Sequence, residues 1–131
     1  MTAAPANIHA LSEEEKEGLY AFAFDAYTCG NYEEGVKVFK HLIAVASLTP
    51  KYWKGLASCL QQSGNLEEAI SSWAMVVLLD ENDAMAHFHA AQCLTAIGNK
   101  EDALKAIILA EEMTSFDKEL QNNLQQLRNM L

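Results

Sequence analysis

The stretch GNYEEGVKVF at residues 30–39 recurs as GNLEEAISSW at residues 64–73 and as GNKEDALKAI at residues 98–107. The three copies align without a gap, at a spacing of 34 residues. This period is typical of a solenoid built from helix-turn-helix repeats. The sequence therefore predicts three helical hairpins. The repeat units expected are about residues 16–49, 50–83 and 84–117.

Each copy opens on a Gly-Asn pair that suits the turn inside a hairpin. The glycine can adopt the left-handed conformation that ends the first helix, and the asparagine can cap the second. Helix starts agree with this register, since Ser12 with Glu15 forms a capping-box pattern and Thr49 precedes Pro50 at the first helical position. Asn82 or Asp83 is expected to cap the next helix.

Small and bulky residues alternate in a way that predicts the core. Small residues recur where the two helices of a hairpin approach closely: Ala23, Ala57, Ala91, Gly35, Ala69 and Ala103. Bulky residues should fill the remaining space: Phe39, Trp73, Ile107, Phe22 and Leu56. Cys59 and Cys93 recur at one repeat position and should be buried packing residues, because three cysteines without a C-x-x-C pair favour neither a disulfide framework nor a zinc ribbon.

The two ends of the chain differ. Four leucines at positions 120, 124, 127 and 131 fall on one face of a helix whose other face is polar, which predicts a capping helix over 118–131. Residues 1–11 carry no comparable pattern and are expected to be a mobile N-terminal segment before a repeat domain at 12–131. The predicted fold class is all-α.

Composition restricts the function. The formal charge is −9 and Arg128 is the single arginine, so nucleic acid is not an expected partner. The apolar run at 74–79 is too short to span a membrane, and the first residues do not resemble a secretory signal, so the expected compartment is the cytoplasm.

Neither an enzyme nor a metal or cofactor site is expected. No phosphate-binding loop, nucleophile elbow or zinc-binding His-Glu-x-x-His sequence occurs in the chain. His87 and His89 would point about 200° apart on a helix and could not chelate one ion. The adjacent glutamates at 33/34, 67/68 and 111/112 are interpreted as solvated charge.

The first helix of each hairpin should line the concave side of such a solenoid. In the first unit Tyr20, Phe24 and Tyr27 share one helical face, next to a packing face with Phe22 and Ala23. The predicted peptide-binding residues are Tyr20, Phe24, Tyr27, Tyr32, Lys54, Ser58, Gln61, Phe88 and Gln92. Alternatively, the three aromatics of the first helix pack against the N-terminal segment. Six of the eleven aromatic residues lie in the first unit, more than one hairpin core needs, which favours an interaction site.

Several stretches resemble one family, the tetratricopeptide-repeat (class II) chaperones of bacterial type III secretion. They are LYAFAFDAY at 19–27, GNYEE at 30–34 with KVF at 37–39, GLASC at 55–59 and FHAAQCL at 88–94. The resemblance covers about residues 11–112. It implies a concave groove that takes an extended, Pro- and Leu-containing segment of a hydrophobic translocator protein, with Tyr20, Phe24, Tyr27 and Tyr32 forming its pockets. The region before the first repeat is shorter than the helix that the family often uses in self-association. The resemblance therefore leaves both a monomer and a homodimer as alternatives.

Two other kinds of repeat protein share this period. Co-chaperones of the heat-shock system grip a carboxylate with basic and amide side chains at five groove positions, where this chain has Tyr20, Phe24, Gly55, Met85 and His89. Those residues supply no such clamp, because a buried carboxylate needs charge-assisted donors. An assembly scaffold without a role in secretion shares the fold and stays an alternative.

Overall fold

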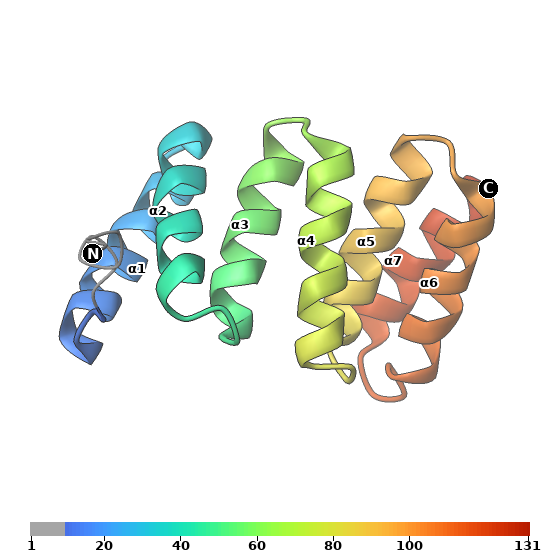
Figure 1. The fold of residues 1–131 in the computed structure, drawn as a ribbon. Helices are drawn as coiled ribbons and strands as arrows, with labels where there is room; N and C mark the ends of the chain where they lie inside the picture. The colour runs from blue at the N-terminus through green and yellow to red at the C-terminus, as the bar shows by residue number, and fades with distance from the viewer. Residues whose placement is uncertain (1–9) are drawn as a thin grey trace, which may run out of the picture.

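The computed structural model describes residues 10–131 and consists there of seven helices without a strand, so the all-α prediction is confirmed (Figure 1). The helices are α1 (Glu13–Thr28), α2 (Tyr32–Val45), α3 (Pro50–Gln62), α4 (Leu66–Leu79), α5 (Ala84–Ala96), α6 (Lys100–Glu112) and α7 (Lys118–Asn129). The first six form three hairpins stacked in chain order, and α7 packs against the last of them. Most of the segment expected to be mobile, residues 1–9, lies outside the described residues.

The turns and helix starts follow the sequence pattern closely. Each hairpin turn contains a glycine in the left-handed region, with φ of 82°, 87° and 86° at Gly30, Gly64 and Gly98. Ser12 and Glu15 form the predicted capping box, and Asp83 accepts a hydrogen bond at the start of α5. The cap predicted for the asparagines is only partly correct. Asn31, Asn65 and Asn99 all occupy the cap position, but Asn99 is the one whose side chain accepts a bond from its helix.

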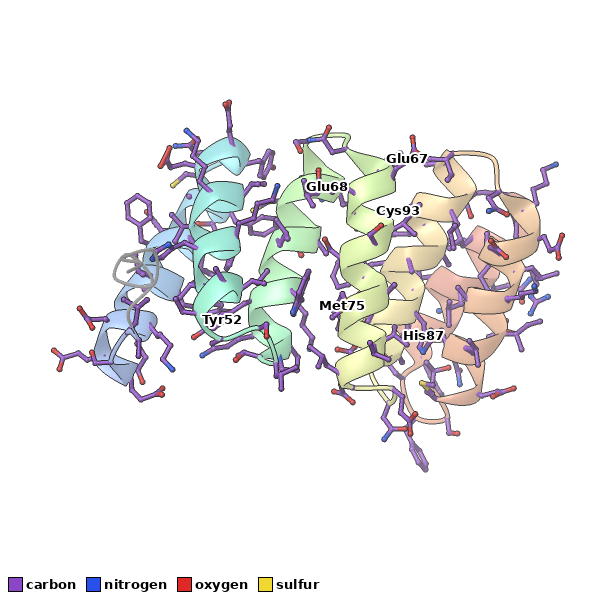
Figure 2. The ribbon with its side chains drawn as sticks, in the orientation of Figure 1. Tyr52, Glu67, Glu68, Met75, His87 and Cys93 are labelled. Atoms are coloured by element: carbon purple, nitrogen blue, oxygen red, sulfur yellow. The ribbon has the colours of Figure 1, made fainter. Side chains whose placement is uncertain are left out.

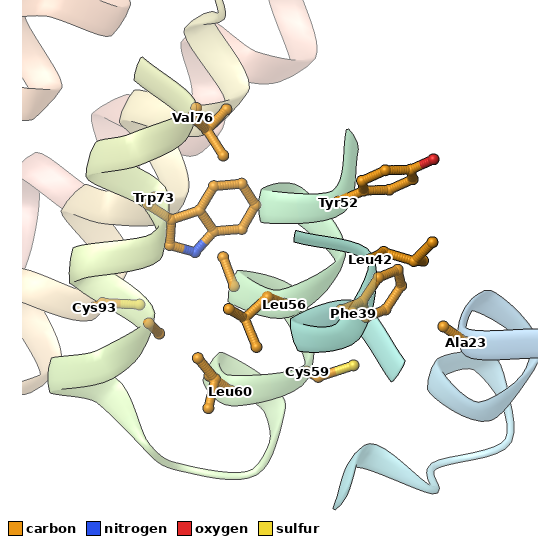
Figure 3. Close-up of a cluster of buried hydrophobic side chains, with 13 residues drawn as sticks. Ala23, Phe39, Leu42, Tyr52, Leu56, Cys59, Leu60, Trp73, Val76 and Cys93 are labelled. Atoms are coloured by element: carbon orange, nitrogen blue, oxygen red, sulfur yellow. The ribbon is translucent and has the colours of Figure 1, made fainter. Parts of the chain in front are cut away.

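The core lies between the hairpins, where the small residues let the helices approach. A Cβ atom added at Gly35 would lie 2.8 Å from Cys59 Sγ, so this position of α2 has no room for a larger side chain. Figure 3 shows Cys59 with Phe39, Leu56 and Trp73 in one buried cluster. Cys59 and Cys93 are buried as predicted, and burial raises the pKa of each thiol to about 11. Both therefore stay uncharged at neutral pH and act as packing groups.

Two of the sequence expectations about packing and charge are wrong. Phe22 was expected in the core, yet its side chain is 54% exposed. Leu56, at the same repeat position, is buried in α3, which has a preceding hairpin packed against it, whereas α1 has none among the described residues. Glu111 was interpreted as solvated charge, but its carboxylate pairs with the guanidinium of Arg128 at 2.5 Å.

Helix α7 closes the C-terminal end of the stack, as a capping helix should. Leu120, Leu124 and Leu127 are buried in a second cluster with residues of α5 and α6. The ion pair between Arg128 and Glu111 ties α7 to α6, and Gln121 Nε2 donates a hydrogen bond to the Thr114 carbonyl oxygen at 2.6 Å. The exposed face of α7 is polar, which is what the last element of a solenoid requires.

Candidate peptide-binding groove

An aromatic pocket of about 230 Å³ lies between the first two hairpins. Its lining comes from α1, α2 and α3: Tyr20, Phe24, Tyr27, Phe39, Lys51, Lys54, Gly55 and Ser58. Five of the nine predicted binding residues therefore meet in one place. Four of the eight lining residues are aromatic, and the others include two lysines and a serine, a composition that suits an apolar side chain attached to a polar backbone.

The rings of this pocket form a continuous row. Tyr20 contacts Tyr52 and Phe24 with ring centroids 5.9 and 6.1 Å apart, and Tyr27 contacts Phe24 and Tyr32 at 6.5 and 5.9 Å. These separations fall in the range in which tilted aromatic rings attract one another. Tyr32 ends the row and is half-buried behind Tyr27, outside the pocket lining. It supports the pocket from the side.

Phe24 is the most accessible ring of the row. Its side chain is 51% exposed, whereas Tyr20 and Tyr27 are half-buried. A wider and more open hollow, of about 500 Å³, lies against Tyr20 and Phe24 together with Ala21, Asp25 and Thr28 of α1. Phe24 thus borders two hollows and leaves half of its surface exposed. An exposed aromatic ring in this position costs solubility and adds little to folding, which is typical of a binding surface.

Gly55 lines the aromatic pocket at a point where α2 and α3 approach closely. A Cβ atom added at Gly55 would lie 2.3 Å from atoms of the Phe39 ring, so the ring of α2 occupies the space that a side chain on α3 would need. Phe39 itself is 1% exposed and contacts Tyr20 at 6.0 Å between ring centroids. Glycine inside a helix weakens it, and a close approach of this kind is a physical reason to retain one.

We expect Gly55→Ala to destabilise the fold by about 1–3 kcal/mol, because the Phe39 ring would have to leave its place. Gly18→Ala is the matched control, since Gly18 is also helical but has no neighbouring atom within 4 Å of an added Cβ. That control should stabilise the protein by up to about 1 kcal/mol through the better helix propensity of alanine. Denaturant unfolding measures both, and a Gly55→Ala protein as stable as the parent would contradict the packing described.

A network of polar side chains lies between the second and third hairpins. Lys54 Nζ pairs with Asp83 Oδ2 at 2.6 Å. Gln61 accepts a hydrogen bond from Trp73 Nε1 at 2.9 Å and donates one to Gln92 Oε1 at 3.1 Å. His89 stacks on Trp73 with centroids 4.8 Å apart and contacts Gln92 Oε1. Gln61 and Gln92 therefore join the second and third hairpins, and Gln61 is not part of either pocket lining.

A second pocket of about 300 Å³ lies between α5 and α7. It contains two predicted residues, Phe88 and Gln92, with Asn123, Gln126 and Leu127 of α7 and Met130 directly after that helix. Phe88 is less available than predicted, because the capping helix covers it and leaves 7% of it exposed. We call the aromatic pocket, the polar network and this α5–α7 pocket together the groove. Gln92 connects the α5–α7 pocket to the polar network, and Lys54, which lines the aromatic pocket and pairs with Asp83, belongs to both the network and that pocket.

Sequence reasoning missed part of this groove. Lys51, Gly55 and Phe39 line the aromatic pocket but were not among its predicted residues. The signal for Gly55 was a glycine in mid-helix, which points to a close approach. Phe39 had been assigned to the core, where it also lies. The sequence of α7 did not indicate that this helix lines the groove. Its polar face is expected of any helix that caps a solenoid.

The rest of the described chain offers little for chemistry. No three His, Cys, Asp or Glu side chains of residues 10–131 lie close enough together to hold a metal ion. His87 is buried on α5 (Figure 2), and His89 is held by Trp73. None of the seven helices is both long and apolar enough to cross a membrane.

Comparison with known proteins agrees with the repeat fold. A family model described as a tetratricopeptide repeat matches residues 50–71. The chain is 30% identical to the low calcium response locus protein H of Yersinia pestis, over 96% of this chain and 75% of that protein.

Solved structures extend the comparison. The type III secretion chaperone SycD of Yersinia enterocolitica, in complex with a peptide of the translocator YopD, is 30% identical, with a TM-score of 0.86 and coverage of 90% of this chain and 92% of that one. The chaperone PcrH of Pseudomonas aeruginosa, in complex with the chaperone-binding region of PopB, is 29% identical, with a TM-score of 0.80 and coverage of 92% and 98%. From the repeats, the fold and these similarities together, the chain belongs to the family of tetratricopeptide-repeat chaperones of type III secretion.

Proposed function

We propose that this protein is a chaperone that binds an extended segment of a hydrophobic translocator protein in the groove and keeps it soluble until export. The observation that carries the proposal is the aromatic pocket, in which five predicted residues meet, among them the half-exposed Phe24. In this proposal the nine predicted residues act as the binding site, with Tyr32 and Gln61 supporting it from behind.

The chemistry of the groove suits an extended peptide. A Pro-containing segment is already extended and loses little conformational entropy when it binds. Its apolar side chain would enter the aromatic pocket, and its backbone carbonyls would accept hydrogen bonds from Lys54 and Ser58. Further along, the amides of Gln92, Asn123 and Gln126 can both donate and accept, so the α5–α7 pocket would hold more of the backbone.

The relatives support the choice of partner. SycD and PcrH have been solved with peptides of the translocators YopD and PopB. We infer the same class of partner here, with the cytoplasm as the compartment, because a translocator must be held before it leaves the cell. A homodimer is part of this proposal as well, since SycD has been solved as a dimer. No catalytic step belongs to this function.

Co-expression with a translocator from the same cell tests the proposal. The translocator should stay in the supernatant and elute with this chain, and it should pellet when expressed alone. The alternative is an assembly scaffold, which would co-purify with components that are not exported. Purification from the native cell followed by mass spectrometry distinguishes the two. A translocator that pellets equally with and without the chain would contradict the chaperone function.

A further inference from the structure

Lys51 places an uncompensated positive charge at the rim of the aromatic pocket. Its Nζ atom lies 4.6 Å from the ring centroid of Tyr20 and 5.7 Å from that of Tyr52. An ammonium group at these distances is attracted to the ring faces, so the two tyrosines hold the charge beside the pocket opening. Lys51 is exposed, and the ion pairs of the described residues do not include it.

The other basic residues are placed differently. Among the nine, six form ion pairs with carboxylates of this chain: Lys16, Lys37, Lys40, Lys54, Lys105 and Arg128. Lys100 and Lys118 are not paired in this way, but each is the first residue of its helix and lines neither pocket of the groove. Lys51 is therefore the cation that both lacks a carboxylate and borders a candidate binding site.

The charge at this pocket also runs against the charge of the chain. The whole sequence carries a formal charge of −9, yet the pocket lining contains two lysines and no carboxylate. The nearby Asp83 is already engaged, because it pairs with Lys54 and accepts a hydrogen bond from the backbone N–H of Ala86 at 3.0 Å. Asp25 lines the wider hollow beside Phe24 and not the pocket itself. The pocket is thus a local positive site on an acidic protein.

We propose that the aromatic pocket selects a segment with a Glu or Asp side chain beside its apolar anchor residue, and that Lys51 receives this carboxylate. The inference rests on the proposed function and specifies what the bound segment must contain. Opposite charges that face each other across an interface favour the correct partner and its register. Because the two rings already hold Lys51 in place, less side-chain entropy is lost when the ion pair forms. A basic residue at the same position would meet the ammonium group of Lys51 and be repelled.

A substitution scan on one peptide tests this inference. The probe is the YopD peptide bound by the Yersinia chaperone, synthesised with each position in turn as Glu, Gln or Lys. Binding to the intact chain is titrated at low salt. At one position beside the apolar anchor, Glu should bind roughly two- to fivefold more tightly than Gln, the range typical of an exposed ion pair, and Lys should bind more weakly still. The difference should shrink at high salt.

Two lysine variants decide whether Lys51 is responsible. Lys51→Met should abolish the preference for Glu over Gln, whatever the affinity of the variant for the Gln peptide. Lys118→Met removes the same charge from α7, away from the aromatic pocket, and should retain the preference. Equal binding of Glu and Gln at every position, or a preference that survives Lys51→Met, would overturn the inference while leaving the groove in place. If no version of the peptide binds the parent chain, this inference is overturned, and the proposed function is decided separately by co-expression with a translocator from the same cell.

Discussion

Replacing Phe24 by alanine should weaken binding of the translocator segment roughly 30-fold or more, because truncation of a well-buried aromatic anchor costs on the order of 2–4 kcal/mol. Phe24 borders both hollows of the first hairpin and is half-exposed in the free chain, so a bound segment would cover it. Since the ring contributes little to the core, the helices should be retained. Titration calorimetry with circular dichroism on the same sample measures both quantities.

Phe22→Ala is the matched control for this variant. Phe22 lies on the same helix, is 54% exposed and is also a phenylalanine, but it lines neither hollow beside Phe24. Its removal should change binding little. Glu67→Ala, on the exposed first turn of α4, should also have little effect. Equal losses from Phe22→Ala and Phe24→Ala would show that general surface hydrophobicity, and not the pocket, accounts for binding.

Deleting residues 118–131 should abolish cooperative unfolding and cause aggregation. Three leucines of α7 are buried against α5 and α6, and each buried leucine contributes roughly 1.5–3 kcal/mol. Their combined loss is comparable to the whole stability of a small domain, about 5–15 kcal/mol. The deletion would also expose Phe88 and Ile107. Thermal unfolding and size-exclusion chromatography provide the readout.

A point variant separates the packing of α7 from the effect of truncation. Leu124 is fully buried, so Leu124→Ala should cost about 2–5 kcal/mol and lower the melting temperature while the chain remains monodisperse. Gln125→Ala, on the exposed face of the same helix, should have almost no effect. A truncated chain as soluble and as cooperative as the parent would show that α7 does not act as a cap.

The features that sequence predicted well are those that local chemistry controls. The three turn glycines must adopt positive φ, and the capping box at Ser12 needs only Glu15 three residues later. Cys59 and Cys93 recur with the repeat and so share its buried environment. The aromatic pocket was also accessible, because Tyr20, Phe24 and Tyr27 share one face of α1. Each of these inferences requires only the repeat register.

The features that sequence missed depend on which elements become neighbours. Phe22 occupies a buried position of the repeat, but α1 is the first described helix and has no preceding hairpin against it. Phe88 was expected to face the groove, and the packing direction of α7, which covers it, is not encoded in the repeat period. Lys51 became part of the site through its contacts with Tyr20 and Tyr52. Such contacts between helices are set by the assembled stack.

Site-specific photo-crosslinking tests the central claim, that the groove binds the translocator segment, most directly. A photoreactive residue at Ser58 would stand in the aromatic pocket, whereas one at Ser71 would stand on the exposed surface of α4, away from both pockets. Our account predicts that position 58 crosslinks to the bound translocator and that position 71 does not. Crosslinking at position 71 with none at position 58 would contradict it and place the partner outside the groove.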